Sequence, residues 1–392
     1  MKRITDNCTG CRACEQLCPK HCIAMRPDKE GFATACVDEE KCVDCGLCRK
    51  SCPQNRTDLL NQTAHRTIAV RLKDEGTLHK SASGGAFAGL AAAVINQGGV
   101  VFGVRYNEDL KAIHAKAESQ EELYPLLSSK YVQSDTGSAY QEVKDYLMTG
   151  RLVLFSGTGC QVAGLKSYLK VDYDNLILID LVCHGVTSPL LFQKYIEMLS
   201  KKHGAKIEEY DFRDKSGGWG LGYKYKYKYK YGLCTLDPYY KYFLDGTAYR
   251  ECCYSCKYAK TERCGDITIA DYWGIEKFHP SFYSYKGVSL VLLNTEKGNL
   301  FWEKSSNCFE WIESKLEYAV VENGNLQKPT RRKAEVRDHI YDEINTLPAA
   351  GYFKKCMPVC PSMADCVKSF MPMRLKLTIK RIIWIIKKYS RK

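Results

Sequence analysis

Two cysteine runs of identical spacing lie near the start of the chain and restrict what this segment can fold into. The first is Cys8, Cys11, Cys14 and Cys18, followed by Pro19, and the second is Cys42, Cys45, Cys48 and Cys52, followed by Pro53. In the pattern C-x2-C-x2-C-x3-C-P, three thiolates hold one 4Fe-4S cluster and the fourth reaches another. We therefore assign one cluster to Cys8, Cys11, Cys14 and Cys52, and the other to Cys42, Cys45, Cys48 and Cys18.

A zinc ribbon or a disulfide knot is the alternative explanation of these runs. A zinc site needs only four ligands, which a single run already supplies. The chain contains 21 cysteines but does not open with a signal peptide, which favours metal ligands in a reducing cytoplasm over disulfides. We predict an α+β module over residues 1–57, similar to a bacterial two-cluster ferredoxin, in a cytoplasmic protein that moves single electrons. Cys22 and Cys36 are expected in its core.

The following residues alternate between strand-like and helix-like segments, which predicts an α/β domain with a mixed sheet over residues 67–345. Expected strands are Thr67–Leu72, Gly99–Tyr106, Leu110–Ala117, Leu152–Phe155 and Leu176–Leu181, and expected helices are Gly84–Asn96, Tyr140–Met148 and Pro189–Leu199. The Tyr-Lys alternation of Tyr223–Tyr231 predicts one half-buried strand, with a basic stripe for a partner or nucleic acid as the alternative.

Residues 346–392 are predicted to be a C-terminal extension that ends in a basic amphipathic helix. Eight of its basic residues and no acidic residue lie between Arg374 and Lys392, so this tail carries most of the formal net charge of +13. The charge is therefore no evidence for a nucleic-acid partner. The helix either contacts an anionic membrane peripherally or docks on a protein surface. Cys356, Cys360 and Cys366 are expected to be structural.

Two further groups of residues carry chemistry in the α/β domain. The Ser81–Gly85 turn lies between a strand and a helix, where backbone amides can bind phosphate. Cys160 and Cys183 follow predicted strands whose ends share one crevice, and Cys253 and Cys256 form a C-x2-C pair. Together these four cysteines make a plausible thiolate site, with buried, inert cysteines as the alternative.

The order of these segments resembles the coenzyme F420 hydrogenase/dehydrogenase beta-subunit family. The relevant segments are S-A-S-G-G at 81–85, G-T-G-C-Q-V-A-G at 157–164, C-H-G-V at 183–186, C-Y-S-C at 253–256 and G-D-I-T-I-A-D-Y-W-G at 265–274. The resemblance implies a flavin-binding α/β domain with FAD beside a third 4Fe-4S cluster. Ala82 and Gly159 depart from the family pattern, which has serine and proline there.

Carried over by position, the resemblance places Ser83, Gly84 and Gly85 at the FAD and makes Cys160, Cys183, Cys253 and Cys256 the ligands of the third cluster. Cys252 and Cys264 are additional thiols nearby, so the choice between Cys252 and Cys253 stays open. His184 is a candidate for catalytic proton transfer, or a structural residue. Asp266 and Asp271 either orient the flavin or cap loops.

These features predict an iron-sulfur flavoprotein oxidoreductase that exchanges electrons between a hydride donor or acceptor, coenzyme F420 or another, and 4Fe-4S clusters. Its partner would be a redox protein or a small hydride carrier. The alternative is a non-catalytic electron-transfer subunit that docks on a larger redox enzyme.

Overall fold

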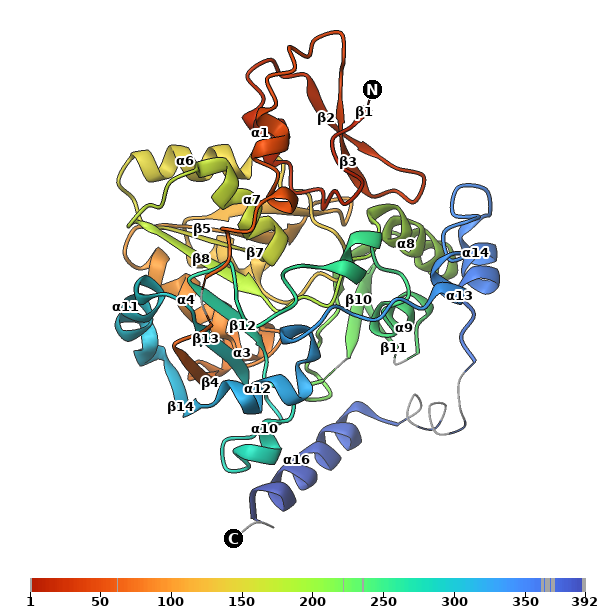
Figure 1. The fold of residues 1–392 in the computed structure, drawn as a ribbon. Helices are drawn as coiled ribbons and strands as arrows, with labels where there is room; N and C mark the ends of the chain where they lie inside the picture. Colours follow the sequence, from red (N-terminus) through yellow and green to blue (C-terminus); the bar gives the residue numbers. More distant parts are fainter. Residues whose placement is uncertain are drawn as a thin grey trace.

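The computed structural model describes residues 2–61, 63–220, 222–234, 236–360, 363, 367 and 371–389. Its centre is an eight-stranded mixed sheet with the strand order β14-β4-β13-β12-β8-β7-β5-β6 (Figure 1). The strands are β4 (Arg66–Leu72), β5 (Val100–Tyr106), β6 (Ala112–Ala117), β7 (Val153–Thr158), β8 (Leu176–Leu181), β12 (Ile267–Asp271), β13 (Ser289–Leu293) and β14 (Phe309–Ser314). The expected mixed sheet is therefore confirmed.

The middle of this sheet is parallel. Strands β5, β7, β8 and β12 run in one direction, and the remaining neighbours pair antiparallel. The continuous apolar sequences of β7 and β8 are buried because helices cover both faces. Thr158, Leu181 and Asp271 end β7, β8 and β12 at the same edge, which we call the carboxyl edge.

Each face of the sheet packs on its own helices. Helices α4 (Ala86–Ile95) and α11 (Glu296–Ser305) bury apolar residues against one face. Helices α6 (Ala139–Met148) and α7 (Gly159–Leu169) cover β5, β7 and β8 on the other face. Helix α7 begins directly after β7 because Thr158 and Gln161 form a capping box. This local sequence fixes the position of Cys160 in the first turn.

An aromatic-rich lobe packs beside the sheet. It consists of α8 (Pro189–His203), β9 (Ile207–Asp211), β10 (Tyr223–Tyr227), β11 (Lys230–Cys234), α9 (Pro238–Leu244) and α14 (Ala349–Cys356), with β9, β10 and β11 forming a second antiparallel sheet. The prediction of one strand over Tyr223–Tyr231 is wrong, because Tyr227 pairs with Lys230 in a hairpin. Lys228 adopts a positive φ of 50° in the two-residue turn, which the Tyr-Lys alternation does not reveal.

The N-terminal module lies at one end of the molecule, above α6 and α7 (Figure 1). It contains β1 (Lys2–Arg3), α1 (Ala13–Leu17), β2 (Ile23–Pro27), β3 (Ala33–Val37), α2 (Leu47–Lys50) and η1 (Pro53–Asn55). Each cysteine run leads into one short helix, and the residues before the two helices, Arg12 and Gly46, both have positive φ. The internal repeat of the sequence is thus a repeat of backbone structure.

Shorter elements and the C-terminal segment complete the fold. They are α3 (Glu75–Lys80), α5 (Gln120–Leu123), η2 (Tyr124–Leu126), η3 (Glu251–Ser255), α10 (Ile275–Phe278), η4 (Ser306–Cys308), α12 (Leu316–Glu322), η5 (Gly324–Leu326), α13 (Ala334–Arg337) and α16 (Met373–Tyr389). Within the described ranges, no helix has the length and apolarity needed to cross a bilayer. Cys356 is partly buried at the end of α14 and Cys360 is exposed, while Cys366 lies outside the described residues.

Candidate iron-sulfur sites

The second cysteine run and Cys18 surround one cavity in the N-terminal module. The cavity has a volume of about 290 Å³, and Cys18, Cys42, Cys45 and Cys48 line it. These are the four residues that the sequence assigns to one cluster. Cys22 also lines this cavity, with its Sγ 3.4 Å from that of Cys18. As expected, Cys22 packs in the small core of the module, but it lies close to the proposed ligands.

The other four proposed ligands of the module, Cys8, Cys11, Cys14 and Cys52, lie close to one another. Cys11 and Cys14 both interact electrostatically with Cys8 and Cys52. Burial raises the pKa of the Cys11 thiol to about 12. The amide of Gly10 donates a hydrogen bond of 3.4 Å to the sulfur of Cys8. Burying four thiolates is costly unless cations compensate their charge, and iron would do so.

A third set of cysteines lines a smaller cavity, of about 50 Å³, at the carboxyl edge of the sheet. Its cysteines are Cys160, Cys183, Cys252, Cys253 and Cys256. Cys160 comes from the first turn of α7 and Cys183 follows β8, and burial raises the pKa of both thiols. The other three belong to η3 and the residue that follows it. The predicted convergence of the two strand ends and the Cys252–Cys256 segment is therefore present.

Within this third site, Cys252 and Cys253 differ in the thiols with which they interact electrostatically. Cys160 interacts electrostatically with Cys256, Cys183 and Cys252, and Cys256 also interacts with Cys252. Cys253 interacts with Cys183 and with Cys252 itself. The Cys252 and Cys253 side chains also hydrogen-bond with each other. The fourth ligand stays a prediction, and the interactions with Cys160 and Cys256 point to Cys252.

Three cationic side chains line the same cavity: Arg250, Lys257 and Arg263. Arg263 is 2% exposed and pairs with the buried Asp180 at 3.1 Å, while its Nε has no partner among the described residues. A buried donor of this kind suits an anionic group in the cavity. None of these three cations was predicted from the sequence. Their closeness to the cysteine segment in the sequence was the available signal.

The first N-terminal site and the third site are neighbours. The thiol of Cys252 points at the backbone oxygen of Cys8, with 3.5 Å between sulfur and oxygen. On the α7 side, a Cβ added at Gly164 would lie 3.0 Å from the Cβ of Cys11. Glycine at this position thus allows the helix that carries Cys160 to pack closely against Cys11.

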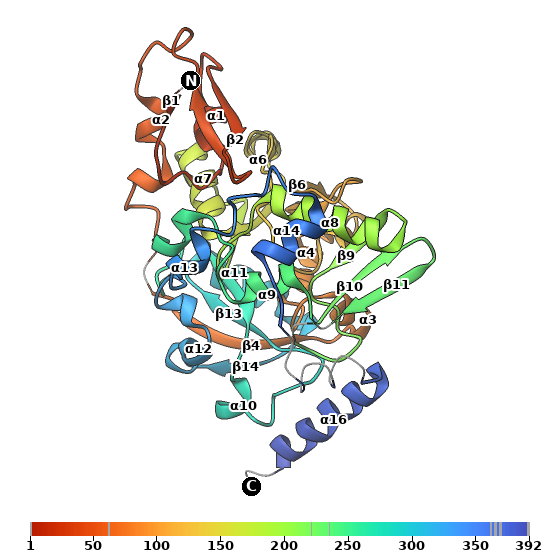
Figure 2. The ribbon, with the colours of Figure 1, turned by 90° about the vertical axis from the view of Figure 1, so that its right-hand side faces the viewer.

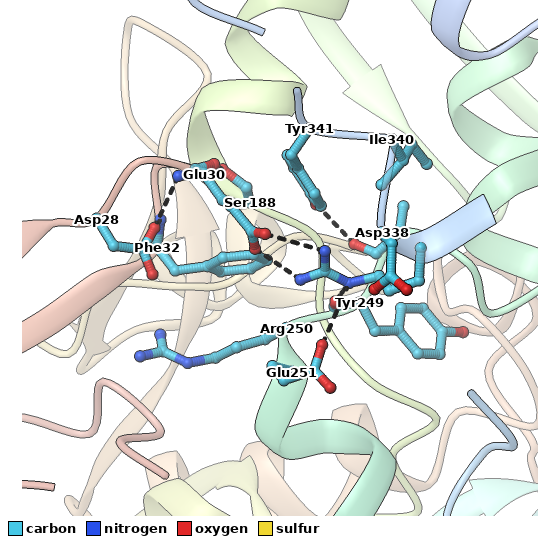
Figure 3. Close-up of polar contacts among 12 residues, drawn as sticks. Asp28, Glu30, Phe32, Ser188, Tyr249, Arg250, Glu251, Asp338, Ile340 and Tyr341 are labelled. Atoms are coloured by element: carbon cyan, nitrogen blue, oxygen red, sulfur yellow. Dashed lines mark hydrogen bonds and ion pairs between the residues drawn. The ribbon is translucent and has the colours of Figure 1, made fainter. Parts of the chain in front are cut away.

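A buried ion pair also connects the N-terminal module to the third site (Figure 3). Arg337 points its guanidinium at the carboxylate of Glu30, with bonds of 3.0 and 2.6 Å, and its Nε donates to the Tyr249 carbonyl at 2.7 Å. The next residue, Arg250, donates to the carbonyl of Ala33 at 3.0 Å and lies over the ring of Phe32. These bonds hold residues 249–250, which lead into the Cys252–Cys256 segment, against the loop between β2 and β3.

The Ser83–Gly85 turn has a structural explanation. All three residues are buried. A Cβ at Gly84 would overlap the Ser289 amide and the Val70 carbonyl, and the Ser83 hydroxyl donates to the Val288 carbonyl at 2.8 Å. The turn is packed against β4 and β13, so it does not fit as a phosphate cradle for FAD.

The two predicted flavin aspartates lie at opposite edges of the sheet. Asp271 ends β12 at the carboxyl edge, where Arg213 donates to both of its oxygens at 2.6 and 2.7 Å and Trp219 donates at 2.7 Å. Asp266 precedes β12 at the far edge, where its carboxylate accepts from the Leu178 amide at 2.9 Å. Both carboxylates thus have structural partners.

His184 follows Cys183 at the third site and lines its cavity. The residue is exposed, and its side chain hydrogen-bonds with Asn325. It also interacts electrostatically with Asp271 and Arg213. His184 therefore lies between the cysteine site and the Arg213–Asp271 pair, and its catalytic role stays a prediction.

In the described part of the chain, no three His, Cys, Asp or Glu side chains form a group suited to a single metal ion. The ligands of a 4Fe-4S cluster have a different arrangement, because each thiolate binds a separate iron and the four sulfurs surround the cluster.

Comparisons with known protein families match two segments of the chain. Residues 7–56 match the 4Fe-4S dicluster domain, and residues 150–314 match the family described as the C terminus of the coenzyme F420 hydrogenase/dehydrogenase beta subunit. One segment of the chain thus matches a 4Fe-4S dicluster domain and another matches the C terminus of this beta-subunit family. These matches confirm the resemblance and support 4Fe-4S binding by the N-terminal module.

Two individual proteins are also similar. Ferredoxin-2 of Chlorobaculum tepidum is 46% identical over 43 residues, which are 11% of this chain and 61% of that ferredoxin. A chain in a structure of the F420-reducing NiFe hydrogenase complex from Methanosarcina barkeri is 15% identical, with a TM-score of 0.46. That alignment covers 77% of this chain and 92% of the other.

Proposed function

We propose that this protein is an electron carrier in which three 4Fe-4S sites form one continuous series. The observation that carries the proposal is the close approach of the first N-terminal site to the third site: the Cys252 sulfur lies 3.5 Å from the Cys8 carbonyl oxygen, and α7, which carries Cys160, packs against Cys11 at Gly164. Iron-sulfur clusters supply one-electron transfer, and their potentials depend on charge, hydrogen bonding and exposure. The protein supplies the ligands, their separation and their electrostatic surroundings.

The proposed ligands differ in their surroundings from one end of the series to the other. The cavity around Cys18, Cys42, Cys45 and Cys48 includes the exposed Cys45 and is also lined by both acidic and basic residues. The third site is lined by Arg250, Lys257 and Arg263, and acidic residues are absent from the described lining. Nearby cations stabilise the more negative, reduced form of a cluster. We therefore place the higher reduction potential at the third site, so that electrons that enter from a partner protein at the exposed Cys45 move toward the third site.

The test is electron counting in anaerobically purified protein. Fully reduced wild-type protein should deliver about three electrons per chain to a one-electron acceptor, one from each cluster. The Cys160→Ser variant should deliver about two, because it retains only the N-terminal sites. Cys308→Ser is the matched control, since Cys308 bonds to the Ser305 carbonyl away from all three sites. Equal yields from wild type and Cys160→Ser would reject the three-site series.

The second candidate is a flavin-linked oxidoreductase, in which FAD supplies hydride chemistry next to the third site. The beta-subunit family match and the position of His184 beside Cys183 favour it. The Ser83–Gly85 turn is packed against the sheet, so we derive no flavin contact from it. Acid extraction of the anaerobically purified protein tests this candidate. Stoichiometric FAD would support the flavin-linked oxidoreductase. A flavin-free extract from protein with full iron content would reject it and leave the electron carrier as the remaining proposal.

A further inference from the structure

Helix α16 contacts the body of the protein through the face that carries Trp384. Leu377, Arg381 and Trp384 are spaced four and three residues apart, which places them on one side of the helix. The Trp384 indole donates to the Tyr283 carbonyl at 2.6 Å, and its ring lies 5.8 Å from that of Tyr285. The Arg381 guanidinium lies 5.3 Å from the Tyr285 ring centroid.

The opposite face of α16 is an apolar stripe that points away from the protein. Its members are Leu375, Ile379, Ile382, Ile383 and Ile386, and their exposed fractions range from 36% to 57%. An amphipathic helix on a globular protein normally turns its apolar stripe toward the core. Here the helix is attached by its tryptophan side and leaves these five aliphatic residues uncovered, together with Ile385 beside them. The sequence predicted either membrane contact or docking on a protein surface for this helix. The structure allows both at once, because the two contacts use different faces of α16.

The charge around this stripe indicates which kind of surface the stripe contacts. Between Arg374 and Lys392 there are eight basic residues and no acidic one. At 100° per residue, positions 376, 380 and 387 fall on one flank of the stripe and positions 374 and 381 on the other. An apolar stripe between two basic flanks is the pattern of a helix that lies in the headgroup region of an anionic bilayer. We propose that α16 binds the protein to an anionic lipid surface.

The charge also argues against a second copy of the chain as the occupant. Pairing two such stripes would bring sixteen basic residues together without one acidic residue from either helix. Such a contact is repulsive, whereas anionic headgroups would neutralise each helix separately.

The position of α16 suits an attachment that leaves the iron-sulfur module free. In both ribbon views α16 and the N-terminal module lie at opposite ends of the molecule (Figures 1 and 2). A surface bound through α16 would therefore leave the β1–β3 end and Cys45 open to a redox partner.

Vesicle co-sedimentation of the full chain tests this inference. The key variant carries Ile379→Gln, Ile383→Gln and Ile386→Gln, all at exposed positions. Its matched control carries Met148→Gln, Val171→Gln and Leu300→Gln, which are also exposed but lie elsewhere on the protein. The probes are vesicles of equimolar phosphatidylcholine and phosphatidylglycerol, and vesicles of phosphatidylcholine alone. Each is measured at about 0.05 M and about 0.5 M salt, where screening differs strongly.

Wild type and control should bind the anionic vesicles equally, and the stripe variant should bind at least about tenfold more weakly, because its apolar contact is lost. Binding should fall with salt and be weaker on phosphatidylcholine alone. Equal binding of wild type and the stripe variant would overturn the proposal. A second result would also overturn it. If the wild-type protein does not bind anionic vesicles and forms a dimer that the stripe variant cannot form, the apolar stripe is an interface with a second copy of the chain.

Discussion

At the scale of single residues, the choice between Cys252 and Cys253 separates two ligand sets for the third site. Cys252 is the one that interacts with Cys160, Cys183 and Cys256. We expect Cys252→Ser to lower the iron content from about twelve to about eight atoms per chain, since one of three clusters is lost. Cys253→Ser should keep about twelve. Iron and acid-labile sulfide assays on both anaerobically purified variants check this, and the reverse pattern would assign the ligand to Cys253.

Arg337 provides a second test at this scale, because it connects Glu30 to the Tyr249 carbonyl while only 3% exposed. Arg337→Gln removes one partner of a buried ion pair, which typically costs about 3–5 kcal/mol of stability. It should also slow electron transfer between the N-terminal and third sites, because it releases the chain that leads to Cys252. Thermal unfolding and rapid-mixing reduction kinetics measure the two effects.

The matched control is Arg332→Gln. Arg332 pairs with Glu251 and Asp338 on the surface, so its loss should cost less than about 1 kcal/mol. Similar losses of stability and of transfer rate in the two variants would show that the buried Arg337 junction has no special role.

At the scale of elements, Gly84 distinguishes packing from cofactor binding. A Cβ there would overlap backbone atoms of both β4 and β13, which cannot move without disturbing the sheet. Gly84→Ala should therefore destabilise the protein by about 1–3 kcal/mol or more, with or without a flavin. Chemical denaturation checks this value.

Gly351→Ala in α14 is the control for this glycine substitution. Its Cβ would meet open space, and alanine should stabilise the helix by about 0.5–1 kcal/mol. A harmless Gly84→Ala change would contradict the packing explanation.

The sequence predicted elements well where periodicity and burial agree. The β8 strand has the predicted bounds Leu176–Leu181, and α4 and α6 match their predictions to within about two residues. The Tyr223–Tyr231 error arose because a turn made of Lys228 and Tyr229 contains no glycine or asparagine signal. For the site, cysteine spacing predicted the sets of thiols that meet. It could not predict the distant residues that adjoin them, such as Arg337 and Glu30, which only tertiary packing brings together.

At the scale of the whole molecule, the iron-sulfur module and α16 occupy opposite ends, and the third site lies between the module and the sheet. The module is attached through several polar contacts, including the Gln133 amide on the Thr9 carbonyl at 3.0 Å and the Tyr258 hydroxyl on the Pro53 carbonyl at 3.2 Å. These contacts hold the first N-terminal site against the segments that carry Gln133 and Tyr258. The order of the sites is thus a property of the whole fold.

The most direct test of the three-site account is the iron and acid-labile sulfide content of the wild-type protein after strictly anaerobic purification. Three cubane clusters predict about twelve iron atoms and about twelve sulfides per chain. About eight iron atoms and about eight sulfides per chain would show that the third site binds no cluster and that only the N-terminal module does. Iron near one atom per chain, or zinc in its place, would contradict the iron-sulfur account of the cysteine runs.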